Sequence, residues 1–210
     1  MRERWARRGW SEAALRAAGS YALLAALATA LALALRDGVP WVHPDPWLVE
    51  PVGTLGGAPP SLPAPPVVAL VSSAVLGLAV ATAIIAFTRV TVRRFDWARR
   101  LHSELRPVAL DLTTVGQILV VAGLSSLGEE LFFRGLLVPI VGVVPPALVF
   151  GLVHQMKGPS RWVWAGWATV VGLMLGSVFA LTGSLVGPLL ARAVINAANL
   201  AYLRDHDPAY

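Results

Sequence analysis

The sequence predicts an all-α protein that crosses the membrane several times, as a polytopic bundle of about six helices. Of its 210 residues, 56% are hydrophobic and only 14% are charged, and the mean hydropathy is +0.66. Long apolar segments alternate with short segments rich in arginine or proline. This pattern is typical of a polytopic membrane protein and not of a soluble domain.

The composition also excludes several classes of site. The chain has no cysteine, which rules out thiol catalysis, cysteine-bound zinc and disulfides. Its formal net charge is +5, but in a membrane protein clustered arginines report topology first. The sequence contains no nucleic-acid-binding motif, and we expect no nucleic-acid partner.

The N-terminal region, residues 1–107, is predicted to be a hairpin of two spans. Ala13–Leu35 and Val67–Phe87 are each long and apolar enough to cross a bilayer. A signal peptide cleaved near Ala32–Ala34 is the alternative for the first span. The intervening residues 36–66 contain too many prolines for a regular helix and are expected to form a loop.

The arginines predict the orientation of this hairpin. They are concentrated in residues 1–12 and 88–106, whereas residues 36–66 are poor in basic side chains. Because cytoplasmic loops carry an excess of basic residues, both ends of the hairpin are expected inside and the proline-rich loop outside. Arg204 closes the last span on the same side, so both termini are expected to be cytoplasmic, in a plasma membrane of bacterial type.

The second region, residues 108–203, is predicted to be the functional core. Its first segment, Val108–Val141, is too long for one crossing of a roughly 30 Å hydrocarbon layer. Ser125–Gly128 indicates a break there, and a full turn at this point would make seven spans. The remaining expected elements are a short apolar helix, Pro145–Gln155, two spans, Trp162–Leu181 and Gly183–Leu203, and a tail, residues 204–210.

Two adjacent acids and an arginine lie inside this apolar core. Charged groups at bilayer depth are costly unless they are paired or face water, so they indicate function. Glu130 and Arg134 are four residues apart and are expected to pair on one helix face. Glu129 points about 100° away and stays available for chemistry. Ser126 to Glu129 resembles a capping box, which predicts a helix start; a buried ion pair with a helix cap is the alternative interpretation.

His154 ends the short apolar helix. A single histidine in such a place is more often an interfacial residue than a catalyst. It is, however, the only histidine within an apolar segment, and it follows the acidic pair across a short connection. These two facts favour a functional role.

Three polar residues mark the last span. Arg192, Asn196 and Asn199 are spaced by four and three, so they share one helix face, which is expected to point into the protein. Asn199 is expected to hydrogen-bond between helices. Arg192 is a fixed cation that needs an acid, either Glu129 or Glu130.

These motifs resemble those of a known family. Glu129-Glu130-Leu131-Phe132-Phe133-Arg134 resembles the Glu-Glu-x-x-x-Arg motif of the CPBP (Abi) family, which comprises CAAX prenyl proteases and bacteriocin-processing enzymes. Phe150 to His154 looks like its Phe-x-x-x-His motif, and Thr182 to Asn196 is similar to its final motif. Where that final motif usually has a histidine, this chain has Arg192.

The resemblance implies an intramembrane endopeptidase that acts on a membrane-associated peptide or protein. Glu129 would activate a water held by His154, and Asn196, with Arg192, would stabilise the oxyanion. The supporting residues would be Glu130, Arg134, Phe150 and Arg192. A zinc ion would find only Glu129 and His154 as ligands, because arginine cannot bind a metal at ordinary pH.

Two other classes of function stay open. A non-catalytic relative, acting as a scaffold or a bacteriocin immunity protein, would have Arg192 paired with Glu129 and blocking the site. A transporter would also use buried ionisable groups, but it should show internal repeats, and the sequence has none.

Overall fold

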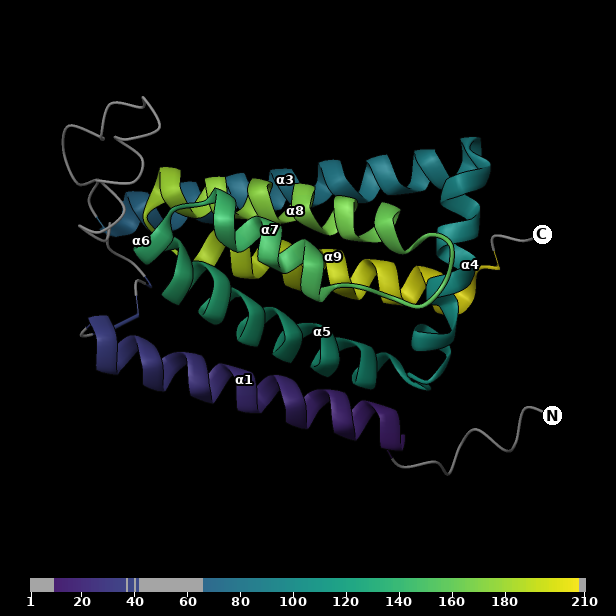
Figure 1. Cartoon of the computed structure of the whole chain (residues 1–210), viewed down its shortest axis with the longest axis horizontal. Helices are drawn as coiled ribbons and strands as arrows, with labels where there is room; N and C mark the ends of the chain where they lie inside the picture. The colour runs from purple at the N-terminus through teal and green to yellow at the C-terminus, as the bar shows by residue number, and fades with distance from the viewer. Residues whose placement is uncertain (1–9, 37, 40, 42–65, 208–210) are drawn as a thin grey trace.

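The structure is a computed structural model that describes residues 10–36, 38–39, 41 and 66–207. Every regular element in these ranges is a helix, which confirms the predicted all-α bundle (Figure 1). The elements are α1 (Glu12–Arg36), α3 (Pro66–Arg94), α4 (Asp96–Leu110), α5 (Val115–Glu130), the π-helix η2 (Leu131–Leu137), α6 (Val138–Val141), α7 (Val144–Val153), α8 (Arg161–Thr182) and α9 (Val186–Asp205).

Five helical segments in the described part of the chain are long and apolar enough to cross a membrane. They are α1, α3, the continuous α5–η2–α6 segment, α8 and α9. The sixth predicted span is α7, which has only ten residues and cannot cross a roughly 30 Å hydrocarbon layer by itself. It packs along α8 instead.

Small residues allow α3 and α9 to approach closely. A Cβ atom on Gly77 would lie 2.2 Å from the carbonyl oxygen of Gly187, so neither position has room for a side chain. The Gly187 amide also donates to the hydroxyl of Ser73 across 2.9 Å. Close packing and buried hydrogen bonds of this kind are what hold helices together in lipid, where burial of apolar surface gives little advantage.

Helix α4 differs from the others in direction and composition. It lies across the end of the bundle and packs against the ends of α3 and α9 (Figure 1). One face buries Ala98, Leu101 and His102, whereas Trp97 remains 47% exposed. An amphipathic helix with exposed tryptophan and flanking arginines is typical of the membrane–water interface.

The predicted break at Ser125–Gly128 is wrong. Helix α5 runs unbroken through these residues to Glu130. The hydroxyls of Ser125 and Ser126 donate to the Ala122 carbonyl oxygen within the helix, so Ser126 caps no helix start. Serine can satisfy its hydroxyl in this way without ending a helix, which is why the capping pattern misled the prediction.

Gly128 and the irregular helix that follows the acidic pair have separate explanations, and neither is a break in α5. A Cβ on Gly128 would lie 2.8 Å from the Tyr21 carbonyl oxygen, so this glycine allows α1 to pack against α5. The helix changes form only after the acidic pair, where η2 takes up the π-helical hydrogen-bond pattern. Such π-turns often occur at functional sites because they re-aim the side chains they carry.

Some predictions concern residues that the structure does not describe. Residues 1–9, most of the proline-rich loop (42–65) and residues 208–210 lie outside the described ranges. Three expectations therefore stay predictions. They are the external position of that loop, the cytoplasmic position of both termini, and the region boundaries at residues 107 and 203.

Candidate active site

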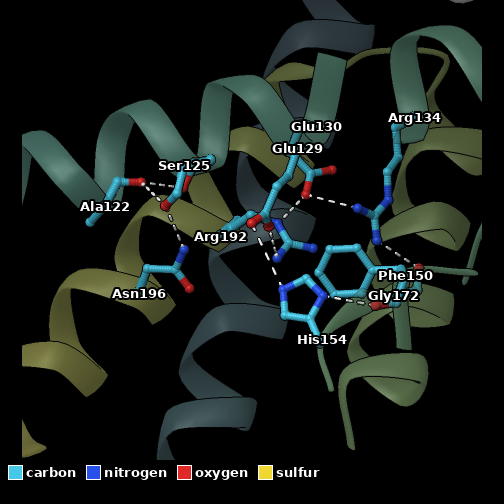
Figure 2. Close-up of polar contacts among 11 residues, drawn as sticks. Ala122, Ser125, Glu129, Glu130, Arg134, Phe150, His154, Gly172, Arg192 and Asn196 are labelled. Carbon is cyan, nitrogen blue, oxygen red and sulfur yellow. Dashed lines mark hydrogen bonds and ion pairs between the residues drawn. The ribbon is translucent and has the colours of Figure 1, made fainter. Parts of the chain in front are cut away.

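The acidic pair lies at the end of α5, inside the bundle. Glu129 is 6% exposed and Glu130 is not exposed. Glu130 Oε1 accepts from Arg134 Nη1 across 3.1 Å, which confirms the expected pairing. Arg134 Nη2 also donates to the Gly172 carbonyl oxygen of α8 across 3.0 Å. This pair therefore ties α5 and η2 to α8 (Figure 2).

Arg192 reaches both acids from α9. Its Nη1 lies 2.7 Å from Glu129 Oε2, and its Nε donates to Glu130 Oε1. The expected contact between Arg192 and an acid is confirmed. Arg192 contacts both Glu129 and Glu130 and not one of them alone. Two carboxylates and two guanidinium groups thus form one charge-balanced, buried cluster, in which each charge offsets the desolvation cost of its neighbours.

His154 faces Glu129 from the end of α7. Its Nε2 lies 3.8 Å from Glu129 Oε1, and its Nδ1 lies 2.8 Å from the Phe150 carbonyl oxygen. A carbonyl oxygen only accepts hydrogen bonds, so Nδ1 carries the proton in the neutral ring and Nε2 presents a lone pair. Glu129 Oε1 and His154 Nε2 are then two acceptors that face each other with no proton between them.

Phe150 holds these groups in place. Its ring centroid lies 4.3 Å from Arg192 Cζ, 5.2 Å from Arg134 Cζ and 4.0 Å from the centre of the His154 ring. A guanidinium over an aromatic face is attracted by the ring quadrupole. The second motif thus supplies both the histidine and the aromatic surface against which the arginines pack.

Asn196 lies beside this cluster and does not contact the acids. Its Nδ2 donates to Ser125 Oγ across 3.0 Å, on the side of Arg192 away from Arg134 (Figure 2). The structure therefore brings Glu129, His154 and Arg192 together and leaves Asn196 next to them. Asn199 bonds to Arg89 Nη1 of α3 across 3.0 Å, the interhelical role expected for it.

One residue of the cluster, Tyr21, was not indicated by the sequence motifs. The hydroxyl of Tyr21, on α1, lies close to Glu129. Tyr21 is the one tyrosine in an otherwise apolar span, and a buried tyrosine hydroxyl usually finds a polar partner. This rule indicates that Tyr21 has a polar partner, but only the packing of α1 on α5 identifies that partner as Glu129.

The residues present do not fit a zinc ion. Within residues 10–36 and 66–207, no three histidine, cysteine, aspartate or glutamate side chains are grouped closely enough to hold one. Glu129 and His154 supply two donors, and the Arg192 cation occupies the position next to them. Because a catalytic zinc site needs three protein ligands, the chemistry below is derived without a metal.

Comparison with known proteins identifies the region that contains this cluster. Residues 111–198 match the family described as "Type II CAAX prenyl endopeptidase Rce1-like". The chain is also 28% identical over 91 residues to the "Uncharacterized protein YpbD" of Bacillus subtilis (strain 168), an alignment that covers 43% of this chain and 48% of the relative. No solved structure matches the chain.

Proposed function

We propose that this chain, whose residues 111–198 form an Rce1-like domain, is an intramembrane endopeptidase that activates water with Glu129. The observation that carries the proposal is the pair of facing acceptors, Glu129 Oε1 and His154 Nε2, 3.8 Å apart. Polar atoms at such a separation are suited to a bridging water. A water that donates to both atoms has its oxygen lone pairs free for attack on a carbonyl carbon.

Each residue of the cluster then has a role. Glu129 takes the proton of the water as the water attacks, and His154 orients that water through Nε2. Arg192 lies beside Glu129 and would stabilise the oxyanion. Asn196 would also donate to the oxyanion once its hydrogen bond to Ser125 Oγ is broken. The substrate class is a peptide or protein at the membrane, because the cluster lies between membrane-spanning helices.

One observation favours a second function. Arg192 Nη1 lies 2.7 Å from Glu129 Oε2 and competes with a water proton for that carboxylate. A non-catalytic relative that serves as a scaffold or an immunity protein would keep this ion pair permanently. The two functions differ in what happens when the guanidinium is removed.

Replacing Arg192 by histidine separates the two functions. For an active enzyme we expect Arg192→His to cleave within about tenfold of the parent rate, since histidine can still donate one hydrogen bond to the oxyanion. The measurement is cleavage of a library of hydrophobic peptides by protein purified in detergent, read by mass spectrometry. Arg89→His is the matched control, because Arg89 contacts Asn199 and not the acids.

Two outcomes would count against an active protease. An inactive parent together with an active Arg192→His variant would show that the guanidinium blocks the site. Inactivity of both, with Arg89→His equally inactive and all three folded, would contradict the protease proposal.

We also propose that both termini face the cytoplasm. The beginning of α1, the end of α9 and α4 lie on one side of the bundle, and the arginines near them give that side the basic character of a cytoplasmic face (Figure 1). The chain has no native cysteine, so an introduced one reports its own location. In intact cells we expect an impermeant maleimide to label Asp45→Cys and not Ser103→Cys, and the reverse would invert the topology.

A further inference from the structure

A cavity lies apart from the acidic cluster, where α4 crosses the end of α3 and the beginning of α8. Its volume is about 300 Å³, at the lower end of the roughly 300–1,000 Å³ typical of small-molecule sites. None of the acidic-cluster residues lines it. Its walls are mainly apolar and aromatic and include Phe87, Trp97, Leu101, Trp162, Trp164 and Trp167.

Three arginines lie close in sequence to residues that line the cavity, among them Thr91 and Trp97. Arg94 and Arg100 each lie three residues from Trp97, and Arg93 precedes them at the end of α3. All three side chains are exposed, and none forms an ion pair within the described ranges. Basic residues beside exposed tryptophan at a membrane surface attract anionic lipid headgroups.

We propose that this cavity binds one anionic phospholipid. An acyl chain lies among the tryptophans, and the phosphate lies against Arg93, Arg94 and Arg100. This binding needs no catalytic activity and is independent of the proposed function.

The first test fills the cavity. A side chain on Gly166 would enter it without a clash, since a Cβ there has no neighbour within 4 Å. Four of the eight tryptophans line the cavity, so phosphatidylglycerol with brominated chains should quench the fluorescence of protein in neutral detergent. We expect Gly166→Leu to remove the saturable part of this quenching. Gly123→Leu on α5, which also has free space, should keep it.

The second test examines the headgroup. We expect phosphatidylglycerol to bind at least about tenfold more tightly than phosphatidylcholine at low ionic strength, because each nearby basic residue attracts the anion. Replacing Arg93, Arg94 and Arg100 by glutamine, or adding 1 M salt to the parent protein, should abolish this preference. Arg16→Gln, on α1, is the matched control and should retain it.

Saturable quenching that is equal in Gly166→Leu and the parent would overturn the cavity as the site. Equal affinity for the two lipids in the parent would overturn the anionic headgroup.

Discussion

Glu129→Gln is expected to lower the rate of peptide hydrolysis by at least about 100-fold, the minimum contribution of a well-placed general base. Glutamine has the shape of glutamate, and its amide oxygen can still accept from Arg192 Nη1, which lies 2.7 Å from Glu129 Oε2. It cannot take a proton from water. The substitution therefore removes the base while leaving the packing around Phe150 and His154 in place.

The measurement compares initial cleavage rates of parent and variant protein on the same peptide. Circular dichroism and elution volume should be unchanged, which would separate loss of chemistry from loss of fold. Glu12→Gln is the matched control, because Glu12 is an exposed acid at the start of α1 and should leave the rate unchanged. Full activity of Glu129→Gln would assign the base to another group and contradict the mechanism.

Arg134→Met is expected to destabilise the folded protein by about 3–5 kcal/mol, the usual cost of removing one partner from a buried ion pair. Arg134 and Glu130 are both fully enclosed, and Arg134 also donates to the Gly172 carbonyl oxygen. Methionine fills much of the same volume but removes the additional donor to that carbonyl oxygen and leaves part of the Glu130 charge without a partner. The loss should appear as a lower midpoint in denaturant titration in mixed micelles.

Arg99→Met provides the matched control. Arg99 forms an ion pair with Asp96 at the surface of α4, where such pairs contribute at most about 1 kcal/mol. Glu130→Gln should also chiefly lower stability, since Glu130 binds both Arg134 and Arg192. Equal stability of Arg134→Met and the parent protein would refute the structural role of this pair.

Composition and residue spacing were enough to predict the membrane bundle and to single out most of the residues in the buried polar cluster. Apolar segments of about 20 residues have few folded alternatives in a bilayer, because only helices satisfy the backbone there. Charged groups inside such segments must find partners, so the pairing of Glu130 with Arg134 followed from a spacing of four. Both arguments use local chemistry, which a single chain reveals.

How the motifs meet depends on the packing of the helices. The contact of Arg192 with both acids, the contact of Tyr21 with Glu129 and the bond of Asn196 to Ser125 join helices far apart in the sequence. Local patterns carry no information on such packing. For the same reason they misassigned Gly128, whose missing side chain makes room for α1 and does not break α5. A glycine in a helix serves either purpose, and the neighbour that approaches it determines which one.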